Sequence, residues 1–297
     1  MAKKHNIVFK RQNEKEMQSL ILTQYFTYKS AKIWSGILLL VMVFIPIIIN
    51  IILWINDNEM IAGYIAFASI IIIILGEILS NKVQSEKNLA AMIQQKFDLY
   101  VFNMGNISFI DENAVTIQIE KYKDKEFARK KDWYPNYEHM DSSKTVFYCQ
   151  KENVDWTHNL TKRYRTFLKI TIIVIMILFV TNMIANNSSF ITVLSILAIA
   201  LPIIAYSLSL FANMKKVDKD FDEIKRIISR VDDNLSDLSQ EKLMKLTYAI
   251  QILIYRYRQK KCLIPDWFEK KNHSNLQEVE NRKSGQRKRR DRENKNS

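Results

Sequence analysis

Residues 33–55 read IWSGILLLVMVFIPIIINIILWI, and after a four-residue break residues 60–79 read MIAGYIAFASIIIIILGEIL. The two runs contain 23 and 20 residues. A bilayer core of about 30 Å requires about 20 helical residues at about 1.5 Å each. Two further apolar runs follow at 167–185 and 190–212. The chain therefore contains four candidate membrane spans arranged as two pairs.

A buried core helix of a soluble protein is the alternative interpretation of such a run. Core helices are usually shorter and carry a polar face, whereas residues 69–79 contain no charged side chain before Glu77. Isoleucine-rich runs favour strands in water, but an isolated segment in lipid must satisfy its own backbone hydrogen bonds and is therefore helical. The sequence predicts a mainly α integral membrane protein.

Positive charge is excluded from both short breaks between the paired spans. Seven Lys and Arg residues precede the first span, 14 lie in 80–166 and 22 follow Asn213, while the breaks at 56–59 and 186–189 contain none. Lysine and arginine concentrate on the cytoplasmic side of membrane proteins. We therefore expect two transmembrane helical hairpins in the inner (plasma) membrane, with the N-terminus, the region between the hairpins and the C-terminus in the cytoplasm.

These boundaries divide the chain into six parts. We expect a cytoplasmic N-terminal segment (1–32), a first transmembrane hairpin (33–79), a small cytoplasmic domain (80–166), a second transmembrane hairpin (167–212), cytoplasmic amphipathic helices (213–269) and a basic disordered tail (270–297). The tail has ten Lys and Arg against four Asp and Glu and no apolar pattern, which is typical of disorder. Such a tail either binds anionic lipid or stays solvated.

Outside the spans, apolar residues recur at helical spacing in three stretches: 82–102, 214–230 and 237–260. Each stretch predicts an amphipathic helix with an apolar face for packing. The stretch Glu112–Lys125 is ambiguous. Asp111 is suited to cap a helix there, whereas the alternation of Val115, Ile117 and Ile119 suits a strand.

The sequence lacks the signatures of the common enzyme classes. Its five glycines are scattered, so there is neither a phosphate-binding loop nor a dinucleotide fingerprint, and no serine lies in a nucleophile elbow. Cys149 and Cys262 form no zinc-binding pattern with the four histidines, and cytoplasmic thiols stay reduced. We expect no enzyme activity, no metal site, no cofactor and no disulfide.

Few polar residues fall inside the four spans. Asn50, Glu77 and Asn182 are the candidates for a pore or gate, because polar groups at membrane depth are costly and are usually functional. Glu77 lies about one turn from the cytoplasmic boundary, so its carboxylate can alternatively reach water there. Pro46 and Pro202 each free a backbone carbonyl and predict a kink.

Four short blocks outside the spans resemble a known family. They are QKFDLYVF at 95–102, KKDWYP at 130–135, CQKENVDW at 149–156 and LIPDWF at 263–268. Together with the order hairpin, domain, hairpin, helices, they resemble the SMODS-associated four-transmembrane effectors, a family proposed to form pores. The similarity extends from about Lys10 to Lys270, and the tail lies outside it.

The resemblance implies a role in bacterial anti-phage defence. In such systems a partner nucleotidyltransferase senses infection and makes a cyclic oligonucleotide messenger, and the membrane effector permeabilises the inner membrane. We therefore expect the chain to bind the lipid bilayer and a cyclic nucleotide messenger, without direct contact to nucleic acid. Four helices of one chain pack around their own side chains, so a conducting pathway requires a homo-oligomer.

Two other functions remain compatible with the residues. One is a constitutive membrane scaffold or channel accessory protein that binds cytoplasmic partners. The other is a small-solute transporter, which the scarcity of polar residues within the spans disfavours. An adjacent nucleotidyltransferase gene would favour the effector over both.

The messenger site is expected in the cytoplasmic domain, because a cyclic oligonucleotide offers phosphates to basic groups and bases to aromatic rings. The candidate residues are Arg129, Lys130, Lys131, Trp133, Tyr134 and Tyr137, with Arg163 and Arg165 as additional members. The same mixture of basic and aromatic residues also suits contact with anionic lipid or core packing. Arg256, Tyr257 and Arg258 are the next candidates.

Overall fold

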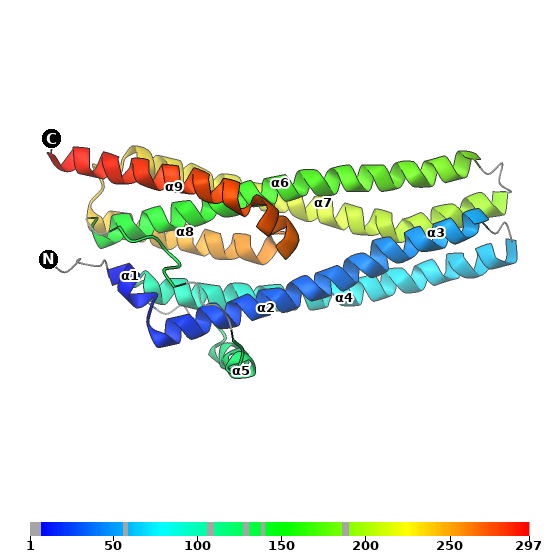
Figure 1. The fold of residues 1–297 in the computed structure, drawn as a ribbon, viewed down its shortest axis with the longest axis horizontal. Helices are drawn as coiled ribbons and strands as arrows, with labels where there is room; N and C mark the ends of the chain where they lie inside the picture. Colours follow the sequence, from blue (N-terminus) through cyan, green and yellow to red (C-terminus); the bar gives the residue numbers. More distant parts are fainter. Residues whose placement is uncertain are drawn as a thin grey trace. The chain divides into compact units, whose positions relative to one another are not determined.

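The computed structural model describes residues 7–55, 59–105, 110–126, 131–137, 140–185 and 190–296. Within these ranges the chain is helical and contains no strand, as predicted (Figure 1). The elements are α1 (Ile7–Arg11), α2 (Lys15–Leu39), the π-helical segment η1 (Leu40–Phe44), α3 (Ile45–Ile55), α4 (Glu59–Val101), α5 (Glu112–Tyr122), α6 (Ser142–Ala185), α7 (Phe190–Asp233), α8 (Gln240–Lys260) and α9 (Asp266–Asn296).

Four of the described helical stretches are long and apolar enough to cross a membrane, which confirms the four predicted spans. The predicted spans are only parts of longer helices. Helix α4 contains both the second span and the amphipathic stretch that follows it, and α6 and α7 likewise continue beyond the apolar runs. A helix need not end where its side chains become polar, because its backbone hydrogen bonds are internal. The two tight turns at 56–59 and 186–189 lie almost wholly outside the described residues.

The ambiguous stretch after Asp111 is a helix. The Asp111 side chain accepts a hydrogen bond from the Ala114 backbone N–H at 3.0 Å, and helix α5 begins at the next residue, Glu112. This is the N-terminal capping contact for which Asp is suited. Val115 and Gln118 are buried one turn apart, so the helical period orients this segment.

The expected disorder after Lys270 differs from the structure, where α9 is helical from Asp266 to Asn296. Phe268 and Leu276 are buried, the His273 ring lies edge-on to Trp156 with centroids 5.4 Å apart, and Lys283 forms a 3.1 Å ion pair with Asp155. Through His273 and Lys283, α9 contacts α6. Composition alone missed this packing because it depends on only four residues of α9.

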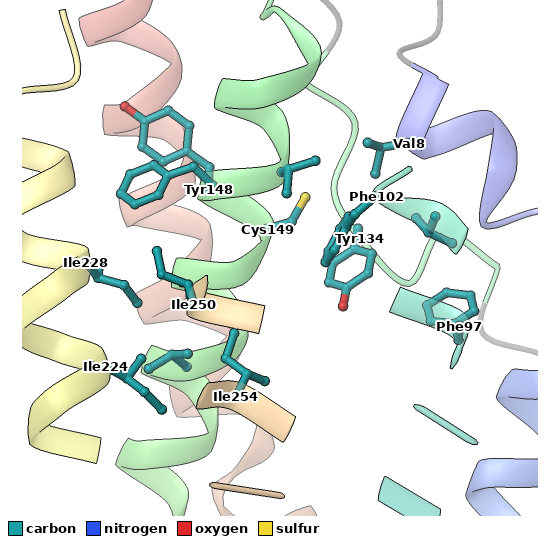
Figure 2. Packing of buried hydrophobic residues seen from close by; sticks show 14 of the residues in the cluster. Val8, Phe97, Phe102, Tyr134, Tyr148, Cys149, Ile224, Ile228, Ile250 and Ile254 are labelled. Atoms are coloured by element: carbon teal, nitrogen blue, oxygen red, sulfur yellow. The ribbon is translucent and has the colours of Figure 1, made fainter. Parts of the chain in front are cut away.

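The described chain divides into two compact units. Unit 1 consists of residues 1–29, 86–162 and 217–297, and unit 2 consists of residues 30–85 and 163–216. In unit 1, one core collects buried side chains from α1, α4, α6, α7 and α8. Figure 2 shows part of this core, with Ile224 and Ile228 of α7 facing Ile250 and Ile254 of α8.

Unit 2 contains the apolar parts of the four spans. One cluster joins Leu53 of α3, Phe179 of α6 and Ile196, Ile199 and Ile203 of α7. Side chains of α3, α6 and α7 therefore fill the same core. Long apolar side chains such as Ile48, Ile74 and Ile173 point outward, as expected for helices that contact lipid.

Helix distortion occurs before Pro46, where the sequence predicted a kink. Residues Leu40–Phe44 form the π-helical segment, and the Ile45 N–H donates to Leu40 O, five residues back. Proline has no N–H to donate to the carbonyl of Met42, and widening the preceding turn is a common adjustment. Pro202, in contrast, lies inside the single helix α7.

Met42 of the π-helical segment contacts α4 at Gly76. A Cβ atom added at Gly76 would overlap the Met42 sulfur, whereas one added at Gly63 on the same helix would meet nothing within 4 Å.

Gly76→Ala should therefore destabilise the protein in detergent by about 1–3 kcal/mol through overpacking. Gly63→Ala is the matched control and should not destabilise. Because Met42→Ala itself removes buried apolar contacts, the test is a double-mutant cycle: the two changes together should cost less than the sum of the single variants, and additive losses would show that the sulfur is not the obstacle.

Candidate functional site

The most distinctive feature of unit 1 is a buried ion pair between Asp98 and Arg258. Asp98 lies near the end of α4 and Arg258 near the end of α8, 160 residues later. Arg258 Nη1 donates to Asp98 Oδ2 at 2.6 Å, and the two side chains are 3% and 0% exposed. Removing charged groups from water costs free energy. A buried ion pair is therefore stable only when further hydrogen bonds satisfy its remaining polar atoms.

Two more side chains donate hydrogen bonds to the Asp98 carboxylate. The Tyr134 hydroxyl donates to Oδ1 at 2.7 Å, and Gln251 Nε2 donates to Oδ2 at 2.9 Å. Gln251 Nε2 also donates to Gln95 Oε1 at 2.8 Å, one turn before Asp98 on α4. Asp98 therefore accepts hydrogen bonds from three side chains, which is the arrangement that stabilises a buried carboxylate.

The network extends from this carboxylate to two other segments. Gln150 of α6 donates through Nε2 to Gln251 Oε1 and to the Thr247 carbonyl, both at 2.9 Å. Gln12, which follows α1, exchanges hydrogen bonds with the Tyr134 backbone at 2.6 and 3.0 Å. The side chains of one buried polar network thus join α4, α6, α8, the residue after α1 and the segment 131–137.

Two amide atoms of this network lack a hydrogen-bond partner among the described residues. They are Gln95 Nε2 and Gln150 Oε1, both fully enclosed. A buried polar group without a partner costs about 1–3 kcal/mol. The described side chains therefore connect the network without satisfying every atom in it.

Burial and the Asp98 carboxylate determine the protonation states of Tyr134 and Arg258. Burial and then the charge of Asp98 raise the pKa of the Tyr134 phenol well above its ordinary value. Burial is the largest single influence on Arg258 and lowers its pKa, but the Asp98 carboxylate, together with smaller contributions from Tyr134 and Tyr28, outweighs burial and the pKa is raised. Tyr134 therefore stays a hydrogen-bond donor and Arg258 a cation.

The predicted messenger-binding stretch is only partly open. Arg129 and Lys130 lie outside the described residues, and Lys131 is exposed. Tyr134 is buried against Phe97 and Phe102, with ring centroids 6.2 and 5.0 Å away.

Two more residues of the stretch also pack inward. Tyr137 is buried and lies 5.9 Å from Tyr148, and Trp133 packs partly against the same core. The rings of Tyr134 and Tyr137 are therefore occupied by core packing in this structure. Arg163 and Arg165 belong to unit 2.

Sequence reasoning named Arg258 only as a next candidate and missed Asp98, Gln150 and Gln251. The available signal was position, because Asp98 follows Phe97 on the packing face of α4. Likewise, Gln251 and Arg258 are seven residues apart beside the apolar stripe of α8. Polar residues on an otherwise apolar helix face are the pattern to seek.

Comparison with known proteins identifies the family. The model of the SMODS-associating 4TM effector domain matches residues 6–282. The chain belongs to this family. It is also 24% identical over 276 residues to a probable CBASS effector molecule of Bacillus cereus (strain VD146), covering 88% of this chain and 91% of the relative. No solved structure matches the chain.

The buried network lies within the matched region of this SMODS-associating 4TM effector, and the four helices agree with the four spans in the family's description. Among the described residues, no group of three His, Cys, Asp or Glu side chains could hold a metal ion. The distinctive polar chemistry of the effector is therefore the Asp98 network.

The three pore candidates of the effector occupy different environments. Asn50 is buried, whereas Glu77 faces outward from α4 and accepts a hydrogen bond from Asn81 at 3.5 Å. The side chain of Asn182 lies outside the described part of the chain. Glu77 therefore differs from Asn50 in pointing away from the chain's own core.

Proposed function

We propose that this membrane effector senses a cyclic oligonucleotide messenger through unit 1, oligomerises and permeabilises the inner membrane during anti-phage defence. The observation that carries the proposal is family membership over residues 6–282, together with four helices able to span a membrane. The Bacillus cereus relative is named as a probable CBASS effector, which agrees with such a role. In this proposal the messenger is made by a partner nucleotidyltransferase, and the effector itself performs no catalysis.

Helix continuity supports transmission of a signal to the membrane. Helix α4 runs without interruption from Glu59 to Val101 and carries both Glu77 and Asp98. A rearrangement of the Asp98 network would therefore act on the same helix that contains the second span. For the messenger to drive such a change, it must bind the active state more tightly than the resting state.

The packing of unit 2 supports the proposed oligomerisation. Leu53 of α3, Phe179 of α6 and Ile203 of α7 are buried together in one core. Since these side chains occupy the centre of the bundle, we propose that several copies line the conducting pathway. Glu77, Asn50 and Asn182 remain the pore candidates, and the outward-facing Glu77 is the one placed to meet a neighbouring copy.

Dye release from liposomes tests the proposal. Full-length protein is reconstituted and titrated with a panel of cyclic di- and trinucleotides, with the matching linear nucleotides as controls. We expect one cyclic messenger to release dye and to shift detergent-solubilised protein to a larger oligomer. If liposomes stay tight and the protein stays monomeric with every cyclic nucleotide, the proposed mechanism is wrong.

A further inference from the structure

The turn between α8 and α9 contacts two helices shortly outside their apolar runs. Lys260, the last residue of α8, forms a 2.7 Å ion pair with Asp220 of α7. Asp220 is the eighth residue after Ala212, where the fourth apolar run ends, so it lies about 12 Å farther along the helix. Lys261 Nζ lies 5.6 Å from the centroid of the Tyr28 ring on α2, and Tyr28 precedes the first apolar run by five residues, or about 8 Å.

Helix α8 runs antiparallel to the part of α7 that it contacts. Tyr257 lies 6.1 Å from Phe221 between ring centroids, and earlier on α8 Ile250 lies beside Ile228 (Figure 2). Residue numbers on α8 therefore rise as those on α7 fall toward its apolar run. The α8–α9 turn is thus the end of α8 that points back along α7 toward that run.

The first two turns of α9 present an aromatic ring and two positive charges to the surroundings. Trp267 is 55% exposed, and Lys270 and Lys271 are exposed as well. The two lysines follow Trp267 by three and four residues, so the three side chains share one face of the helix. Phe268 and Leu276 are buried on a different side of α9. The helix is therefore held in unit 1 while its aromatic and basic face stays open.

We propose that this face of α9, formed by Trp267, Lys270 and Lys271, lies on the surface of the bilayer and binds anionic phospholipid. Tryptophan is enriched at membrane–water interfaces, and lysine is attracted to anionic headgroups. The interfacial region extends about 5–8 Å beyond the hydrocarbon core. Tyr28, which contacts the α8–α9 turn, lies at a similar distance from its apolar run.

The charges on this face favour lipid over a second copy of the chain. A two-fold dimer brings the same patch of both copies together, so Lys270 and Lys271 would face their own equivalents. Like charges opposed across an interface are destabilising. A bilayer that contains anionic lipid offers the complementary charge instead.

Photo-crosslinking of full-length protein in liposomes tests the contact. Benzoylphenylalanine replaces Trp267, and the liposomes contain phosphatidylcholine with phosphatidylglycerol. We expect a covalent phospholipid adduct at position 267. The same replacement at Ile74, which is 57% exposed within the second apolar run, is the positive control. The replacement at Tyr248, an exposed aromatic residue about 20 Å before Lys261 on α8, should give no lipid adduct.

Lipid composition tests the role of the lysines. At low salt the adduct yield at position 267 should be about fivefold or more higher with phosphatidylglycerol than in pure phosphatidylcholine. Lys270→Gln combined with Lys271→Gln should abolish this increase. Lys242→Gln combined with Lys245→Gln removes the same charge from exposed positions near the start of α8, so it is the matched control and should keep the increase.

Three results would overturn the proposal. They are an adduct between two copies of the chain at position 267, no adduct there while position 74 gives one, and a lipid adduct whose yield does not respond to phosphatidylglycerol. The unfolding temperature of each variant in detergent should match that of the wild type, because the replaced side chains at positions 267, 270 and 271 are exposed. No messenger is present in these experiments, so this contact does not rest on the proposed function, and either can fail while the other holds.

Discussion

Asp98→Asn should lower the free energy of unfolding by about 3–5 kcal/mol, because it leaves the Arg258 guanidinium buried without a counter-charge. Arg258→Met should cost less. In that variant the Asp98 carboxylate still accepts hydrogen bonds from Tyr134 and Gln251, whereas in Asp98→Asn the Arg258 guanidinium keeps its charge and has no counter-ion. Chemical unfolding in detergent measures both variants.

The double variant and a surface pair provide the controls. Asp98→Asn combined with Arg258→Met removes both charges, so it should be more stable than Asp98→Asn alone. Lys245 pairs with Glu241 at 2.7 Å on the same helix α8, and both side chains are well exposed. Lys245→Met should therefore unfold close to wild type. If Asp98→Asn also unfolds close to wild type, the buried pair is not a structural determinant.

The second large effect concerns topology. A reporter enzyme that is active only after export should be active when fused after Asn187 and inactive when fused after Glu138. The physical reason is the charge distribution, since the break at 186–189 contains no Lys or Arg while 80–166 contains 14. A reporter that is active only in the cytoplasm should show the reverse pattern.

Fusion-protein level is the control for both reporters. Immunoblots should show similar amounts of each fusion, because both sites lie between helices where insertions are tolerated. An exported reporter that is active at Glu138 and inactive at Asn187 would overturn the two-hairpin orientation.

The four spans were predictable because span length is a property of the linear chain. A run such as 33–55 either has about 20 apolar residues or does not, and lipid then requires a helix. The cap at Asp111 was also visible, because an N-cap uses residues only three apart. The π-helical segment before Pro46 was foreseen only as a kink, because the form of the adjustment depends on packing.

The periodicity of the sequence predicted amphipathic stretches at 82–102 and 237–260. It did not predict which helix faces would pack against each other. Asp98 and Arg258 are 160 residues apart and become partners only because α4 and α8 pack together. Tyr134 was a candidate both for stacking on a base and for core packing, and in the structure it fills the core beside Phe97 and Phe102. Nothing in its immediate sequence distinguishes these two uses.

The sequence alone therefore determined how many helices cross the membrane, because hydrophobic length and charge asymmetry act locally against a bilayer of fixed thickness. Only the tertiary structure decided which polar groups are buried together. The Asp98 network depends on contacts between segments far apart in the chain, and such contacts are set by the packing of helix faces.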